Sequence, residues 1–294
     1  MRILLDSRYL IDVVEHNRPT PPQDFDQYLC AGNHEIVLSF TNVRELVSPL
    51  AFGDNFMRLR PLLQLLEHMP HVYIKEVTIV RAEIQAAVDA FTRGIEYEGC
   101  SVYVTRWDRT LSTLPGQRRS AADGLVNLRL DDIVYYISRV TPHVFGPPDQ
   151  HLPRLRAQLE QDRASLRTGQ APARRHFIGA IKRHAATHGV ALPDGREDEF
   201  AEWVYANPVR CPGLRLNHET FRALMANYED IPETGDFSDL AHIFAVPYVE
   251  AATLDRRMRH YCGIASRKIL RFGAEVDYRD RLFHNLAAIL GNCP

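Results

Sequence analysis

Two aspartates of this chain come directly after short apolar segments with the character of buried strands. Asp6 follows Arg2-Ile-Leu-Leu, and Asp255 follows the β-branched, aromatic and small residues of Tyr248–Leu254. In an open α/β sheet, the carboxyl ends of the strands form the edge at which ligands bind. We therefore expect both carboxylates at one edge of a sheet.

Two further acids lie near the starts of helical segments. Asp239 precedes apolar residues at helical spacing, in a short helix that we expect Ser238 to cap. Glu45 lies on the second turn of a helix that follows the apolar segment Glu35–Ser39, with Thr41 as its expected cap. Both acids are thus predicted near strand-to-helix junctions, as the first two are.

Several carboxylates at one sheet edge repel one another, by several kcal/mol for two charges ~4 Å apart at a protein-like dielectric. A divalent cation offsets this repulsion best, and hard oxygen ligands suit Mg²⁺ or Mn²⁺. Such an ion can activate water for attack on a phosphodiester and stabilise the leaving group. The pattern therefore predicts metal-assisted hydrolysis without a Ser, Cys or His nucleophile.

We assign roles to the acids as hypotheses. Asp6 and Asp255 are expected to ligate the metal, Asp239 to do so directly or through water, and Glu45 to ligate it or to orient a water molecule. Each acid taken alone also fits a turn, a helix cap or an ion pair. Further residues expected near the site are the auxiliary acids Asp236 and Glu250 and the hydroxyl of Thr253 as a partner of a ligand carboxylate. His242 is also expected there, either as a substrate contact or, in the interpretation that we favour, as a histidine with its hydrogen bonds satisfied.

The ordered set of acids resembles that of the PIN-domain ribonucleases. The match consists of Asp6 after a strand, Glu45 in Val-Arg-Glu-Leu, Asp239 opening a helix, and Asp255 in Thr-Leu-Asp. Each motif alone is weak, and the order makes the set more specific. The resemblance implies a Mg²⁺- or Mn²⁺-dependent endonuclease that cleaves single-stranded or structured RNA, with these four residues at its metal site.

The resemblance covers residues 1–78 and 235–280 and is interrupted by a long insertion. It implies an α/β fold with a PIN-like parallel sheet flanked by helices. We assign residues 1–78 and 235–294 to a discontinuous nuclease core and residues 79–234 to a mostly helical inserted subdomain. One position departs from the family pattern, because Arg8 stands where these nucleases usually have Asn or Ser. We therefore expect different residues to support the ligands.

Apolar periodicity and turn residues predict the elements along the chain, and the alternation of strands and helices predicts parallel strands with right-handed crossovers. Strands are expected at residues 2–5, 35–39, 72–74, 101–107, 248–254 and 274–277. The longer helices are expected at residues 54–66, 79–91, 130–140, 150–168, 172–188, 196–206, 217–228, 258–269 and 281–290.

Basic side chains gather in two places. Residues 154–183 contain eight basic and two acidic residues, and a second basic cluster follows the last of the four acids. A solvated helix face explains either cluster alone. Together they indicate a track for RNA phosphates, with Arg174, Arg175, Arg256 and Arg257 as its expected contacts.

Composition limits the class of protein. The 294 residues carry a formal net charge of −2, so attraction to phosphates must be local. The five cysteines include no Cys-x-x-Cys pair, which is typical of reduced thiols in a cytoplasmic protein. No apolar run reaches membrane-spanning length, so no membrane association is expected.

The predicted function is therefore RNA hydrolysis, and two alternatives stay open. A PIN-like module without catalytic activity would use the insertion to hold RNA or a protein. A phosphatase of the haloacid-dehalogenase type would need Asp-x-Asp at the first strand, where this chain has Asp6-Ser-Arg. An inhibitor or partner protein bound through the insertion and a homodimer are further expectations.

Overall fold

The structure is a computed structural model of the whole chain. It describes residues 1–14, 22–51, 63–64, 66–74, 76–104, 157, 160–161, 163–164, 173–227, 229–230, 233 and 235–291. The strands are β1 (Arg2–Leu4), β2 (Glu35–Leu38), β3 (His71–Ile74), β4 (Tyr103–Val104), β5 (Ala251–Thr253) and β6 (Leu282–Phe283). The helices are α1 (Ser7–Val14), α2 (Pro22–Ala31), α3 (Phe40–Ala51), α5 (Glu76–Arg93), α9 (Ala173–Thr187), α10 (Glu197–Ala206), α11 (Pro212–Ala226), α12 (Gly235–Ile243), α13 (Arg256–Leu270) and α14 (Leu286–Gly291), with 3-10 turns η2 (Val246–Tyr248) and η3 (Tyr278–Arg281).

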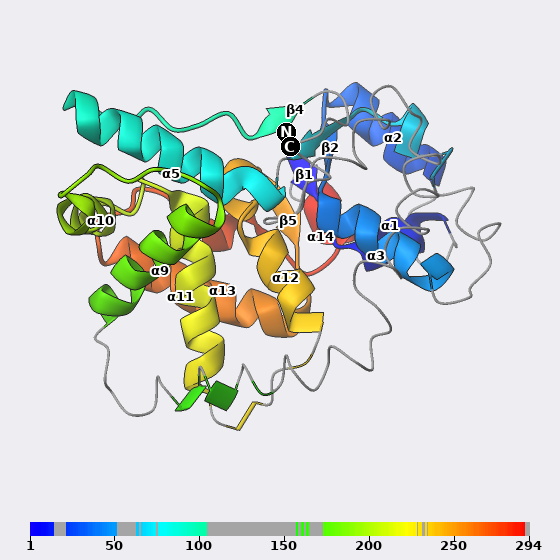
Figure 1. Cartoon of the computed structure of the whole chain (residues 1–294). Coiled ribbons are helices and arrows are strands. Elements are labelled where there is room, and N and C mark those ends of the chain that lie inside the picture. The colour runs from blue at the N-terminus through cyan, green and yellow to red at the C-terminus, as the bar shows by residue number, and fades with distance from the viewer. Residues whose placement is uncertain are drawn as a thin grey trace.

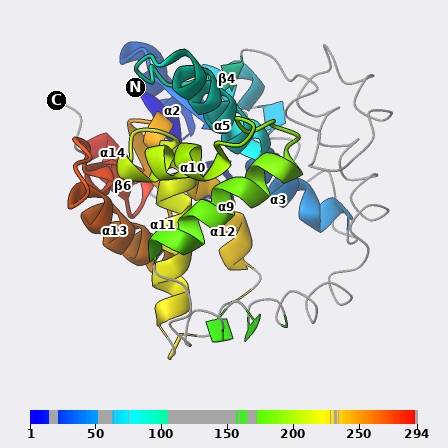
Figure 2. The same ribbon diagram turned by 60° about the vertical axis from the view of Figure 1, so that its left-hand side comes forward.

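The strands form one six-stranded sheet in the order β4-β3-β2-β1-β5-β6. Every neighbouring pair is parallel except β3 and β4, which are antiparallel. The central strand β1 pairs on both sides, with Ile3 opposite Ile36 of β2 and opposite Ala251 of β5. The α/β class and the mostly parallel sheet predicted above are therefore confirmed, with helices on both sides of the sheet (Figures 1 and 2).

Apolar side chains fill both faces of the sheet, as expected for parallel strands. Ile3 and Leu5 point to a core shared with Phe25 of α2 and Leu46 of α3. Leu4, between them, points to the opposite core, which α11, α12 and α13 cover. Because successive residues of a strand alternate in direction, an unbroken apolar run is what such a strand requires.

A third apolar cluster lies away from the sheet, among α5, α9, α10 and α11. Its fully buried aromatic residues are Phe177 and Phe200, and Ile84 of α5 and Leu214 of α11 pack with them. This part of the chain belongs to the predicted insertion. Its helices α9 and α10 agree with the helices predicted at residues 172–188 and 196–206.

The predicted insertion also contributes to the main sheet. Strand β4 extends the sheet next to β3, and Leu216 and Met225 of α11 are buried in the same core as Leu4 of β1. The boundaries at residues 79 and 234 stay a prediction, but α11, which lies between them, is packed into the core of the sheet. The helix predicted at 130–140 and most of those predicted at 54–66 and 150–168 lie outside the described residues.

Several predicted elements differ from the observed ones for local reasons. The strand predicted at residues 274–277 is wrong, because Asp277 caps η3 and the last strand is β6. Only residues 251–253 of the predicted strand at 248–254 form a strand, since Tyr248 lies in the 3-10 turn η2. Helix α11 begins five residues before residue 217, with Pro212 in its first turn.

Candidate active site at the carboxyl edge of the sheet

Asp6 and Asp255 lie just beyond the carboxyl ends of β1 and β5, which are neighbouring parallel strands. The backbone N–H of Asp6 donates to Thr253 Oγ1 at 2.8 Å, which joins the two strand ends. The Thr253 hydroxyl thus holds the backbone of Asp6 and not a carboxylate. Asp255 caps α13, because its Oδ1 accepts a hydrogen bond from the backbone N–H of Met258 at 2.5 Å.

A buried hydrogen-bond network fixes α3 against the end of β1. Ser39, and not Thr41, caps α3: the Asn42 N–H donates to Ser39 Oγ at 3.0 Å, and Asn42 Oδ1 accepts from the Ser39 N–H at 3.1 Å. The Asn42 amide then donates to Leu5 O at 2.9 Å and to Ser7 Oγ at 3.2 Å. This network fixes the position of Glu45, one turn later on α3, relative to the end of β1.

Glu45 is held by three side chains from two other helices. Ser7 Oγ of α1 donates to Glu45 Oε2 at 2.6 Å, and His242 Nε2 of α12 lies 3.6 Å from the same oxygen. Burial alone would raise the pKa of Glu45, but His242, Ser7 and Ser238 together lower it. The carboxylate therefore stays ionised among other acids.

Asp239 has the most perturbed carboxyl group of the four. Burial, followed by the charges of Asp255, Asp6 and Glu45, raises its pKa to about 7, and His242 opposes this rise. The same neighbours act on Asp6, whose pKa is raised by burial first and then by Glu45 and Asp255. The structure thus brings all four predicted acids within electrostatic reach of one another.

The donors are the hard oxygens that Mg²⁺ and Mn²⁺ prefer, and their mutual repulsion leaves negative charge without compensation. Among the described residues, however, no three Asp, Glu, His or Cys side chains already stand in a metal-holding arrangement. The acids face one region without forming a finished coordination shell.

The two auxiliary acids do not join this group. Asp236 accepts a hydrogen bond from the Glu233 N–H at 2.6 Å and pairs with Arg257 at 3.2 Å, although the Asp255 charge still acts on its pKa. Glu250 precedes β5, and its carboxylate accepts a hydrogen bond from the Arg2 N–H at 2.6 Å. Glu250 therefore lies at the amino edge of the sheet, opposite the acids.

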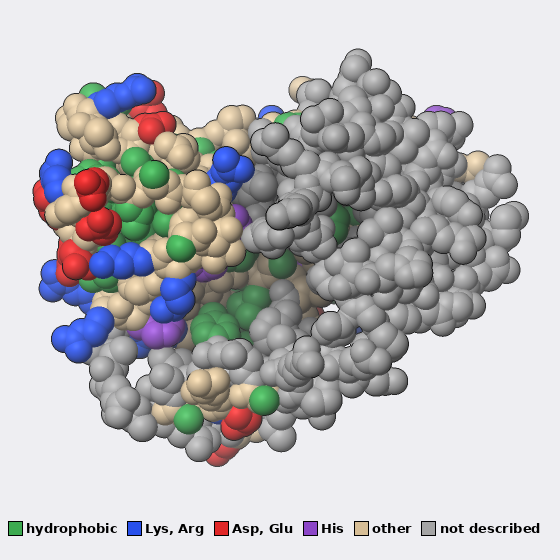
Figure 3. Space-filling view, in the orientation of Figure 1, with side chains coloured by type: hydrophobic (Ala, Val, Ile, Leu, Met, Phe, Trp, Pro, Cys, Tyr) green, Lys and Arg blue, Asp and Glu red, His purple; other side chains and the backbone are tan. Residues whose placement is uncertain are grey.

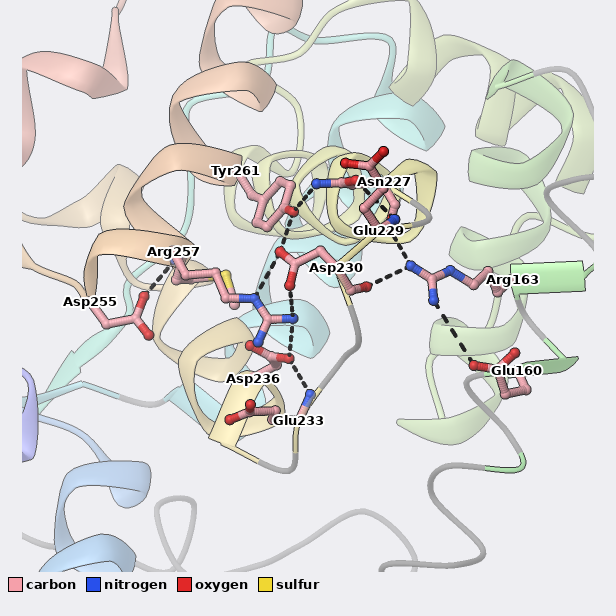
Figure 4. Close-up of polar contacts among 11 residues, drawn as sticks. Glu160, Arg163, Asn227, Glu229, Asp230, Glu233, Asp236, Asp255, Arg257 and Tyr261 are labelled. Atoms are coloured by element: carbon pink, nitrogen blue, oxygen red, sulfur yellow. Dashed lines mark hydrogen bonds and ion pairs between the residues drawn. The ribbon is translucent and has the colours of Figure 1, made fainter.

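A polar network beside the acids fixes the connection between α11 and α12 (Figure 4). Arg257 of α13 pairs with Asp230 at 2.9 Å, and the Tyr261 hydroxyl donates to Asp230 as well. The buried Arg163 donates to the backbone oxygens of Asn227 and Asp230. Arg257 is therefore engaged in structural pairing with two acids, and its role as an RNA contact stays a prediction.

The other predicted RNA contacts differ in their surroundings. Arg174 pairs with Glu202 of α10 at 2.6 Å, while Arg175 is exposed. Lys182 likewise pairs with an acid of α10, and Figure 3 shows Lys and Arg mixed with Asp and Glu on the side where α9 and α10 lie. Arg256 is exposed in the first turn of α13, next to Asp255.

Ser7 and Asn42 were not among the residues predicted at this edge, and His242 was predicted there without its contact to Glu45. A capping pattern, Ser followed three residues later by Asn, is readable at Ser39 and Asn42 in the sequence. His242 is one helical turn after Asp239, so its position on the same face was also readable. Their contacts to Leu5 and Glu45 depend on the tertiary arrangement.

No protein-family model, curated protein or solved structure matches the chain. Among the described helices, none is both long enough and apolar enough to cross a bilayer.

Proposed function

We propose that this chain is a PIN-like, metal-dependent endoribonuclease that hydrolyses RNA phosphodiester bonds at the cluster of Asp6, Glu45, Asp239 and Asp255. The observation that carries the proposal is the environment of Asp239. Its pKa of about 7 reflects burial together with three like-charged neighbours, an arrangement that costs stability unless a cation compensates it.

The position of the cluster supports the same proposal. The acids come from the ends of β1 and β5 and from the helices α3 and α12, so four separate elements converge on one sheet edge. Ligand sites of open α/β sheets lie at this edge. Asp6, Glu45 and Asp239 are half-buried and Asp255 is exposed, so an ion and a substrate can reach the cluster from solvent.

Asp6, Asp239 and Asp255 would hold a Mg²⁺ or Mn²⁺ ion, with Glu45 beside them. When bound, such an ion supplies an activated water and charge stabilisation at the phosphodiester. Glu45 is kept ionised and oriented by His242 and Ser7, so it can accept a hydrogen bond from that water.

The residues around the acids take the supporting roles. The family resemblance leads one to expect Asn or Ser at the position of Arg8, as a support for the ligands. Ser7 and Asn42 take this supporting role here, because they link Glu45 to the end of β1. Arg8 itself is exposed, and only its backbone N–H contacts Asp6, at 2.9 Å. Arg256, exposed beside Asp255, is placed to contact a phosphate of the RNA.

A second candidate is a PIN-like module that binds RNA or a protein and has no catalytic activity. The observation that favours it is that three of the acids already have protein partners, among them Asp6, whose Oδ1 accepts a hydrogen bond from the Arg8 N–H. Asp255 caps α13, and Glu45 is engaged by Ser7 and His242. In this case the acids would stabilise the folded state, and their removal would lower the free energy of unfolding.

Cleavage of labelled RNA by the purified chain in the presence of Mn²⁺ tests the proposal. We expect cleavage by the wild-type chain and none by Asp6→Asn, since the carboxylate at the end of β1 would hold the ion. Glu250→Gln is the matched control, because it removes one carboxylate from the opposite sheet edge.

Circular dichroism of both variants separates loss of chemistry from loss of fold. Wild-type chain that binds RNA in a salt-dependent way but leaves it uncut would support the binding module. Equal loss of cleavage in Asp6→Asn and Glu250→Gln would contradict the assignment of the metal site to this edge.

A further inference from the structure

A second charged group lies away from the acids, along one face of α11. Arg215, His218, Glu219 and Arg222 recur at helical spacing, so their side chains share that face. Helix α9 lies against this face, where His176 Nδ1 is 3.4 Å from His218 Nε2. Helix α13 also packs along α11 (Figures 1 and 2).

Glu219 is the acid that pairs with the cations of this group. Lys268 of α13 pairs with Glu219 Oε2 at 2.5 Å, and Arg215 Nε lies 3.5 Å from Glu219 Oε1. The Glu219 side chain is fully buried, so its charge is shared between these two cations. Two aromatic rings also contact the guanidinium of Arg215. Its Cζ atom lies 4.3 Å from the ring centroid of Tyr205 and 4.7 Å from that of Phe177.

Positive charge is left over after this pairing. Arg222 Nη1 is buried without a hydrogen-bond partner among the described residues, and so is Nη2 of Arg215, a side chain that is 1 % exposed. Arg215, Arg222 and Lys268 bring three positive charges against the one negative charge of Glu219. Buried donors and charges without partners cost stability, which points to a missing anion.

The histidine pair fits this picture. His218 is buried, and burial together with His176, Arg222, Arg215 and Lys268 lowers its pKa to about 2. The imidazole is therefore neutral, and one of its nitrogens can donate a hydrogen bond without adding charge. Arg222 and His176 are half-buried and Lys268 is 37 % exposed, so an anion can reach the group from solvent.

We propose that Arg222, Lys268, His176 and His218 form a binding site for a phosphate group, with Arg215 and Glu219 as its inner layer. A phosphate carries −1.5 to −2 charges near pH 7, about the excess that the three cations leave. Guanidinium and ammonium groups are the usual partners of phosphate oxygens. This site lies on other elements than the acidic cluster and does not depend on nuclease activity.

Binding of inorganic phosphate to the full chain tests this site directly. Isothermal titration at constant ionic strength should detect phosphate binding, and Arg222→Gln should weaken it by about tenfold or more, the loss of one charge-assisted hydrogen bond. Arg267→Gln is the matched control, because it removes the same charge from an exposed position next to Lys268.

A second readout covers the case in which Arg222→Gln fails to fold. The imidazole proton signals of His176 and His218 in the wild-type chain should shift with phosphate and not with chloride. Absence of these shifts and of calorimetric binding in the wild-type chain would overturn the proposal. Equal weakening by Arg222→Gln and Arg267→Gln would overturn it as well, because it would indicate diffuse attraction.

Competition identifies the source of the phosphate. RNA binding is measured without divalent metal ions, with and without saturating inorganic phosphate. If phosphate displaces RNA and Arg222→Gln weakens RNA binding, the site reads the RNA backbone. If phosphate binds and RNA is not displaced, the site takes a free phosphate or phosphate monoester. Both results support the site, and neither requires RNA cleavage.

Discussion

Asp239 and Glu83 both have a pKa of about 7, and burial is the largest cause for each, but their neighbours differ in kind. Asp239 faces three other acids at the carboxyl edge of the sheet. Glu83, in the interior of α5, faces hydrogen-bond donors at the start of α11. The same shift in pKa therefore arises in a carboxyl group that lies among like charges and in one that accepts several hydrogen bonds.

Both carboxylate oxygens of Glu83 accept hydrogen bonds. It accepts hydrogen bonds from the Gly213 N–H at 2.6 Å, the Leu214 N–H at 2.9 Å and the Tyr248 hydroxyl at 2.5 Å. The first two are N–H groups in the first turn of α11, which have no partner within the helix and favour a carboxylate. A Cβ at Gly213 would meet Phe244 O at 2.6 Å, so only glycine allows α11 to approach this closely.

The comparison shows that a raised pKa does not by itself identify a functional acid. Hydrogen bonds lower the pKa of Glu83 against its burial, and the residue links α5, α11 and η2. Like charges raise the pKa of Asp239 further, and His242 offsets them only in part. Structural and functional acids should therefore respond differently to substitution and to added metal.

The largest expected effect is on catalysis. Asp239→Asn should lower Mn²⁺-dependent RNA cleavage by about 10³-fold, because a metal ligand contributes several kcal/mol of transition-state stabilisation. Glu83→Gln should leave the rate per folded molecule unchanged. Single-turnover cleavage, normalised to the folded fraction, measures both. Equal losses would remove the distinction between the two acids.

Stability should change in opposite directions. Glu83→Gln presents an amide to the N–H groups of Gly213 and Leu214 and should lower the free energy of unfolding by about 1–3 kcal/mol. Asp239→Asn removes one charge from a group of like charges and should raise it by about 1 kcal/mol in metal-free buffer. Urea denaturation followed by circular dichroism compares them. Destabilisation by Asp239→Asn would favour the structural role of the acids.

The pH dependence of stability should distinguish the two sites when metal is added. Both pKa values rise from about 4 in the unfolded chain to about 7 in the folded one, so the folded state holds protons that the unfolded state releases. Stability should therefore fall as pH rises through this window. Mg²⁺ should raise the melting temperature more at about pH 8 than at about pH 5.

Variants show which site the metal serves. Asp239→Asn should remove most of the extra Mg²⁺ stabilisation at the higher pH, and Glu83→Gln should retain it. Differential scanning calorimetry with Ca²⁺ and with Na⁺ at matched ionic strength serves as the control. A Mg²⁺ effect that is independent of pH would contradict a titrating carboxyl at the metal site.

The smallest expected effect concerns the basic face of α9. Arg175→Glu should weaken RNA binding and flatten its dependence on salt by about one unit, the loss of one phosphate contact. Arg174→Glu should do less, because Glu202 already neutralises Arg174. Filter binding over a range of salt concentrations measures both slopes. An unchanged slope for Arg175→Glu would remove α9 from the RNA track.

Sequence reasoning succeeded where a signal is local. The apolar runs ending at Asp6 and Asp255 predicted β1, β5 and the parallel sheet, and helical periodicity predicted α9, α10 and α13. It failed at residues 274–277, where the side chain of Asp277 accepts hydrogen bonds from Ser266 and from the backbone of Arg279 and so ends extended structure. Turn chemistry of this kind depends on a partner 11 residues away along the chain.

The amino-acid sequence by itself determined the parallel strands β1, β2, β3 and β5, most of the described helices and the four acids near their junctions, because periodicity and capping act over a few residues. Only the tertiary structure decided that Asp236 pairs with Arg257, that Glu250 lies at the opposite edge, and that His242 reaches Glu45. It also decided which buried charges are compensated, because burial and charge act through space and not along the chain.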